Sequence, residues 1–97
     1  MMQFVVTAYD GTDADALQRR LTAREAHLAG AEELKAEGKL IAGGAILNAD
    51  DEMIGSTLYM EFASRAELDA WLASDPYVTG NVWQEITVQP IRLAVVR

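Results

Sequence analysis

Residues 54–63 carry the clearest periodicity in the chain, and that periodicity requires a sheet. Leu58, Met60 and Phe62 point to one face of the segment, and Thr57, Tyr59 and Glu61 point to the other. One face is therefore apolar. This period of two is typical of a strand that is buried on one face. A single strand or hairpin is only marginally stable, so further strands are expected in the rest of the chain.

The remaining sequence supplies three more predicted strands and two helices. Segments rich in β-branched and aromatic residues indicate strands, and apolar residues at helical spacing between capping signals indicate helices. The predicted strands are residues 2–9, 39–47, 54–63 and 82–96, and the predicted helices run over about 12–37 and 64–75. In the first helix, the inward face is expected to carry Leu17, Leu21, Leu28 and Leu34. Pro90 predicts that the last strand lies at a sheet edge or carries a bulge.

The order strand–helix–strand–strand–helix–strand is the ferredoxin-like arrangement. It predicts an α+β fold, βαββαβ, in which two helices cover one face of a four-stranded antiparallel sheet. The length of 97 residues predicts a single domain over residues 1–97. Residues such as Tyr59 are then left on the uncovered face of the sheet, so we expect a homodimer that packs sheet on sheet.

Composition excludes several classes of protein. The chain has no cysteine, which excludes disulfides and thiolate metal sites. A formal charge of −7 disfavours binding to nucleic acid. No apolar run approaches the length of a membrane span, and no signal peptide is evident, so we expect a cytoplasmic protein that binds no membrane. The acidic run 50–52 is interpreted as a solvated loop, and we expect no metal and no cofactor.

His27 is the only histidine and the first candidate for chemistry. Its spacing from Arg20 and Arg24 places the three side chains along one ridge of the first helix. Two neighbouring cations disfavour an imidazolium, and a neutral ring suits a general base. The alternative is a histidine on the solvated surface of a helix.

Asp75 is the second candidate, and two interpretations fit it. Because it precedes Pro76, it is well placed to cap a short helical turn. The functional interpretation is that its carboxylate accepts the proton of one His27 ring nitrogen and fixes the tautomer. The two residues are far apart in sequence, so only the fold can bring them together.

Several further residues are candidates for the wall of a pocket. Ser56 invites a catalytic triad, but the glycine-framed elbow of such serines is absent, and a pocket hydrogen-bond donor or a structural hydroxyl fits better. Gly44 belongs to a glycine pair that indicates a bulge or a close backbone approach, which makes it a candidate for ligand contact. The aromatic candidates for a pocket wall, with a place in the core or at a dimer interface as the alternative, are Tyr9, Tyr59, Tyr77 and Trp83.

Four stretches resemble the YciI-like (YCII-related) family in order and spacing. They are RRLTAREAHL at 19–28, EGKLIAGGAI at 37–46, GSTLYMEFAS at 55–64 and SDPYVTGNVWQEITVQPI at 74–91. The resemblance implies a dimeric ferredoxin-like α/β barrel with a small pocket in which a histidine and an aspartate are in contact. The family's pair falls on His27 and Asp75, its helical arginine on Arg24 and its serine on Ser56.

Two positions depart from the family pattern. Ala45 and Glu25 stand where many or some relatives have proline, which affects pocket shape or helix geometry but not the pair. Members are mostly of unknown activity, and one branch resembles dehydrochlorinases of chlorinated hydroxyquinols; nothing in this sequence selects that branch. The residues favour a cofactor-independent enzyme of lyase or hydrolase type acting on a small ring or carbonyl substrate. The alternative is a non-catalytic small-molecule binder or accessory domain.

Overall fold

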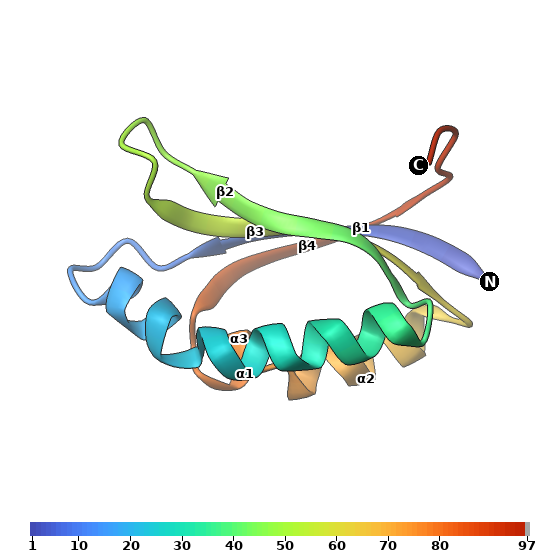
Figure 1. Ribbon diagram of the computed structural model, residues 1–97, viewed down its shortest axis with the longest axis horizontal. Helices are drawn as coiled ribbons and strands as arrows, with labels where there is room; N and C mark the ends of the chain where they lie inside the picture. The colour runs from blue at the N-terminus through green and yellow to red at the C-terminus, as the bar shows by residue number, and fades with distance from the viewer. Residues whose placement is uncertain (97) are drawn as a thin grey trace.

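The computed structural model describes residues 1–96 and contains the predicted βαββαβ order (Figure 1). A one-turn helix, α3, follows Asp75 at the position of the predicted short helical turn. The elements are β1 (Met2–Asp10), α1 (Ala16–Ala36), β2 (Leu40–Leu47), β3 (Met53–Phe62), α2 (Arg65–Ser74), α3 (Pro76–Thr79) and β4 (Trp83–Ile91).

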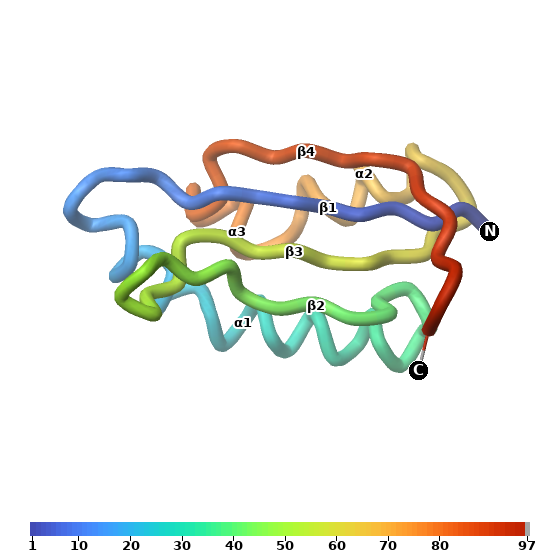
Figure 2. The backbone as a smooth tube through the Cα atoms, turned by 90° about the horizontal axis from the view of Figure 1, so that it is seen from above, coloured from blue at the N-terminus to red at the C-terminus, as the bar shows by residue number. Residues whose placement is uncertain are grey.

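The four strands form one antiparallel sheet in the order β2-β3-β1-β4. All the helices lie against one face of this sheet, and the other face is uncovered (Figures 1 and 2). The ferredoxin-like prediction is therefore confirmed. Pro90 lies in β4, which is an edge strand, as the sequence predicted.

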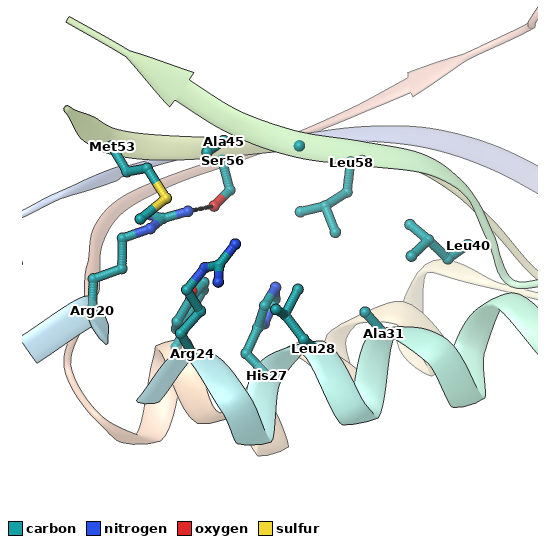
Figure 3. A pocket seen from close by; sticks show the side chains of 13 residues that line it. Arg20, Arg24, His27, Leu28, Ala31, Leu40, Ala45, Met53, Ser56 and Leu58 are labelled. Carbon is teal, nitrogen blue, oxygen red and sulfur yellow. Dashed lines mark hydrogen bonds between the residues drawn. The ribbon is translucent and has the colours of Figure 1, made fainter. Parts of the chain in front are cut away.

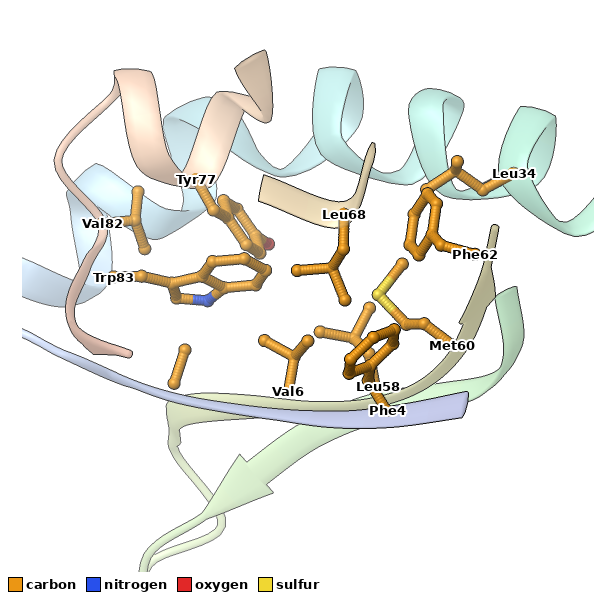
Figure 4. Close-up of a cluster of buried hydrophobic side chains, with 11 residues drawn as sticks. Phe4, Val6, Leu34, Leu58, Met60, Phe62, Leu68, Tyr77, Val82 and Trp83 are labelled. Atoms are coloured by element: carbon orange, nitrogen blue, oxygen red, sulfur yellow. The ribbon is translucent and has the colours of Figure 1, made fainter. Parts of the chain in front are cut away.

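The core lies between the sheet and the helices (Figure 4). The alternation in β3 has the predicted sense, because Leu58, Met60 and Phe62 are all buried. Phe4 and Leu68 are also buried, from β1 and α2. Each such side chain contributes roughly 1.5–3 kcal/mol relative to remaining exposed, and together they fix the helices on this face.

Local signals set the helix ends. The Ser64 side chain accepts a hydrogen bond from the Glu67 N–H at 3.2 Å and begins α2. Gly38 follows α1 with a φ of 76°, a left-handed conformation that glycine adopts without strain. The Lys39 N–H then donates to the Leu34 carbonyl at 2.8 Å, which ends the helix and turns the chain toward β2.

The inward face of α1 differs from the prediction. Leu17, Leu21 and Leu28 are exposed, and of the four leucines only Leu34 is buried. The buried positions of the helix are instead Ala16, Arg20, His27 and Leu34. Three of them precede the exposed leucines by one residue, a rotation of about 100° around the helix. The leucines and the buried residues both have helical spacing, so spacing alone does not choose between them. Arg20 and His27 are buried because their side chains have hydrogen-bond partners in the interior.

The uncovered face of the sheet is mixed in character. Val5, Thr7 and Thr57 are partly buried there by their neighbours, while Tyr9 and Tyr59 remain exposed. The molecule measures 21 Å along its shortest axis, which suits one sheet layer and one helix layer. No helix within residues 1–96 is both long and apolar enough to cross a membrane.

Candidate functional site

A cavity of about 290 Å³ opens between α1 and the strands β2 and β3 (Figure 3). This is near the lower limit of small-molecule pockets, and it is large enough for a single ring. Its polar side chains come from three elements: α1, β3 and α3. They are Arg20, Arg24, His27, Ser56 and Tyr77. The backbone of Gly44 and the side chain of Ala45 contribute to the wall from β2.

The predicted contact between His27 and Asp75 is present. His27 Nδ1 lies 2.8 Å from Asp75 Oδ2, and both side chains are buried. Asp75 sits between α2 and α3, and the same oxygen accepts a hydrogen bond from the Tyr77 N–H at 3.0 Å. The two interpretations of Asp75 are therefore compatible, since one carboxylate caps α3 and holds the imidazole.

The His27 ring is fixed on several sides. The Tyr77 ring stacks on it with a centroid distance of 3.9 Å and an interplanar angle of 10°, and Trp83 meets it edge-on at 5.5 Å. With Nδ1 held by Asp75, Nε2 is the remaining ring nitrogen, and it has no hydrogen-bond partner within residues 1–96. Figure 3 shows the imidazole rising from α1 into the cavity. A fixed ring with one free nitrogen is suited to proton transfer.

The Tyr77 hydroxyl is a second polar group at the cavity. The residue is 1% exposed, and within the described chain its oxygen has no hydrogen-bond partner. Burial raises the pKa of the phenol, and the charges of Arg20 and Arg24 oppose that shift. The hydroxyl therefore keeps its proton at neutral pH and can donate a hydrogen bond.

Arg20 forms a buried ion pair behind the cavity. Its Nη1 donates to both oxygens of Asp10, at 2.9 and 3.1 Å, and its Nη2 donates to Ser56 Oγ at 2.8 Å. Trp83 Nε1 donates to the same oxygen at 3.1 Å. Asp10 was not predicted as a site residue, because in the sequence it stands where a strand ends. The available signal was Arg20 itself, because an arginine on the buried stripe with His27 requires a carboxylate nearby.

Arg24 is the exposed cation of the site. It lines the cavity and forms no ion pair within the described residues. The protein carries a formal charge of −7, yet the cavity is lined by two arginines and by no carboxylate. Asp10 and Asp75 lie behind the lining side chains. The cavity therefore favours an electron-rich or anionic ligand.

The sequence model of the YCII-related domain matches residues 2–92. The chain belongs to the YCII-related family. Protein YciI of Escherichia coli (strain CFT073) is 36% identical over 97 residues, which cover 94% of this chain and 97% of the relative. An uncharacterised protein of Haemophilus influenzae is 34% identical with the same coverage.

Solved structures agree with this assignment. The structure of 5-chloro-2-hydroxyhydroquinone dehydrochlorinase (TftG) from Burkholderia phenoliruptrix, in complex with 2,5-dihydroxybenzoquinone, is similar with a TM-score of 0.84. Its sequence is 32% identical, and the match covers 96% of each chain. A dimeric ferredoxin-like protein from Jannaschia matches with a TM-score of 0.54 and 16% identity, over 96% of this chain and all of that chain. The latter likeness concerns the fold alone.

Ser56 of this YCII-related domain does not form a triad. Ser56 Oγ accepts hydrogen bonds from Arg20 and Trp83, and no hydrogen bond joins it to His27 within residues 1–96. The triad alternative is therefore wrong, and Ser56 lines the cavity as a polar wall residue.

The aromatic candidates separate into different locations. Tyr77 lines the cavity, and Trp83 lies in the core just behind it. Tyr59 is exposed on β3, on the uncovered face of the sheet, and Tyr9 lines a different hollow near the end of β1. Position 25, the other departure from the family pattern, is on the exposed part of α1 and is absent from the cavity wall.

The acidic run 50–52 forms an exposed turn between β2 and β3. Its geometry comes from the Asn48 side chain, whose oxygen accepts hydrogen bonds from the N–H groups of Asp50 and Glu52 at 2.9 and 3.1 Å. Among the residues that the structure describes, no group of three or more His, Cys, Asp or Glu side chains is arranged to hold a metal ion.

Proposed function

We propose that this YCII-related protein is a cofactor-independent enzyme in which His27 transfers a proton on a small ring or carbonyl substrate. One observation carries the proposal: His27 Nδ1 is held by the buried carboxylate of Asp75, while Nε2 is left for the cavity. In this arrangement the proton resides on Nδ1, and the basic lone pair of Nε2 faces the ligand.

The other polar groups have complementary roles. Asp75 stabilises the imidazolium that forms when Nε2 accepts a proton from the substrate. Arg24, whose charge is not paired within the described chain, lies where it can stabilise negative charge that develops on the substrate. The hydroxyls of Ser56 on β3 and Tyr77 on α3 position the substrate.

The similarity to TftG supports a lyase-type step. That protein is a dehydrochlorinase of 5-chloro-2-hydroxyhydroquinone, and its structure contains 2,5-dihydroxybenzoquinone. In such an elimination a base accepts a proton and the leaving group departs with its electron pair. The cavity of about 290 Å³ has room for one substituted ring of this kind. We therefore extend the proposal to hydroxylated rings as the first substrates to test.

The decisive experiment compares wild type with His27→Ala. Each is incubated with 5-chloro-2-hydroxyhydroquinone and with a panel of hydroxylated rings, and chloride release and ring absorbance are followed. We expect His27→Ala to lower the rate by roughly 10²–10⁴-fold, the usual contribution of a general base. Circular dichroism and elution volume check that the fold and assembly persist.

The control is Leu21→Ala, an exposed leucine of the same helix that lies outside the cavity wall, which should retain full activity. Full activity in His27→Ala would remove the imidazole from the mechanism. Wild type that binds these rings without converting them would support the alternative, a non-catalytic binding domain. If His27→Ala lowers the melting temperature and changes nothing else, the His27–Asp75 contact has only a structural role, as a link between α1 and α3.

We also propose that the protein is a homodimer in which the uncovered sheet faces meet. The partly apolar outer face around Val5 and Tyr59 is available, and a second sheet would complete its burial. Two structures of similar fold are described as dimeric ferredoxin-like proteins, which is consistent with this arrangement.

A further inference from the structure

The bonding around Ser56 Oγ restricts what its hydroxyl can do. Arginine and tryptophan side chains have no acceptor atoms, so Arg20 Nη2 and Trp83 Nε1 both donate to this oxygen. A hydroxyl oxygen has two lone pairs, and these two bonds occupy both of them. The only hydrogen-bonding function left to Ser56 is donation of its own proton.

The direction of that proton follows from the positions of the two donors. Arg20 approaches from α1 and Trp83 from β4, which lies beyond β1 on one side of β3. The remaining direction around the oxygen is toward β2, where Ala45 pairs with Ser56 and where the cavity lies. Figure 3 shows the serine side chain descending from the sheet toward the cavity.

Asp10 fixes this arrangement from behind. Both of its oxygens accept from Arg20 Nη1, and the two side chains are each 3% exposed. The guanidinium cannot rotate without breaking a buried ion pair, which is costly because it leaves an unpaired charge in the interior. The hydrogen bond from Arg20 to Ser56 is thus a consequence of Asp10.

We propose that Asp10 and Trp83 are positioning residues that, with Arg20, make Ser56 an obligate donor, and that the ligand atom it meets is a hydrogen-bond acceptor, a role that an oxygen without a hydrogen fills best. The chemical class is a ring or enediol ligand whose contacting oxygen is a carbonyl or an ionised hydroxyl. The inference deepens the proposed function and rests on the same cavity. A neutral phenol oxygen also accepts this proton, but it is the weaker acceptor, and its own proton finds no acceptor on Ser56.

A redox pair of probes tests the inference by binding alone. The oxidised probe is 2,5-dihydroxy-1,4-benzoquinone, which offers carbonyl and ionised oxygens. The reduced probe is 1,2,4,5-tetrahydroxybenzene, the same skeleton after addition of two electrons and two protons, with a hydroxyl at all four positions. Calorimetry under anaerobic conditions should show that wild type binds the oxidised probe at least about tenfold more tightly, the effect expected of one or two hydrogen bonds.

Variants connect this preference to the network. Trp83→Phe keeps an aromatic ring but frees one lone pair of Ser56, so the ratio of the two dissociation constants should fall at least about threefold. Asp10→Asn should move the ratio in the same direction, by releasing Arg20. In a Ser56→Ala background, Trp83→Phe should change the ratio no further, because the hydroxyl through which it acts is gone. Trp71→Phe, a partly buried tryptophan outside the cavity, is the matched control and should leave the ratio unchanged.

Three results would overturn the inference. They are equal binding of both probes by wild type, failure to bind the oxidised probe up to about 1 mM, and a Trp83→Phe effect that is the same with and without Ser56. Each is read at equilibrium without turnover. A protein that binds with the expected preference but catalyses nothing would therefore refute the proposed function and leave this inference standing.

Discussion

At the scale of single residues, the site depends on side chains that each make two contacts. Asp75 Oδ2 accepts from the His27 ring and from the Tyr77 N–H, and Ser56 Oγ accepts from Arg20 and Trp83. Such shared atoms make structural and functional roles inseparable by simple deletion. Substitutions that keep the shape and remove one property are needed to separate them.

Asp75→Asn is such a substitution. The amide oxygen can still accept the Tyr77 N–H and cap α3, but it carries no charge to stabilise an imidazolium. We expect the turnover number to fall roughly 10²-fold or more, with little change in melting temperature. Asp75→Ala removes the cap as well and should also destabilise the protein by about 1 kcal/mol. Steady-state kinetics and thermal unfolding measure both, and undiminished turnover in Asp75→Asn would show that the carboxylate charge has no part in the reaction.

At the scale of elements, α1 determines the site because it presents a polar stripe to the interior. Arg20 and His27 occupy buried positions along this helix, while Leu17, Leu21 and Leu28 are exposed. The stability of α1 therefore rests partly on its polar contacts and partly on its backbone. Two glycines, one inside the helix and one at its end, allow the backbone contribution to be measured.

We expect Gly30→Ala and Gly38→Ala to have opposite effects on stability. Gly30 lies inside α1, and a Cβ added there would meet no atom within 4 Å, so alanine should raise the free energy of unfolding by about 0.5–1 kcal/mol. Gly38 has a φ of 76°, where a side chain costs about 1–2 kcal/mol. Urea unfolding of both variants gives the two values. A stabilising Gly38→Ala, or a destabilising Gly30→Ala, would contradict this account of α1.

At the scale of the whole molecule, the protein has two layers and one uncovered face. The helices cover only one side of the sheet, and the 21 Å thickness leaves no third layer (Figures 1 and 2). Exposed apolar residues include two groups within elements, one on the outer face with Tyr59 and one on α1 with Leu21. The proposed dimer uses the first region.

Charge substitutions distinguish the two surfaces. Tyr59→Glu places a carboxylate at the centre of the proposed interface and should convert the dimer into a monomer, as measured by light scattering after size exclusion. Leu21→Glu introduces the same charge on α1 and should leave the dimer intact. The reverse outcome would move the interface from the sheet to the helix.

The sequence by itself determined the order of the elements and the inward face of β3. Alternation fixed the side of β3 that carries Leu58, and capping residues such as Ser64 fixed helix ends, because both depend on neighbours within a few residues. The family resemblance also led to the contact between His27 and Asp75, which spacing alone left open.

Only the tertiary structure decided which stripe of α1 is buried. Two stripes one residue apart satisfy the same helical period, and the choice depends on partners such as Asp10 and Ser56, which come from other strands. The sequence does not show which distant residues come into contact. A buried arginine or histidine is stable only where distant side chains supply its hydrogen bonds, and the fold alone brings those side chains together.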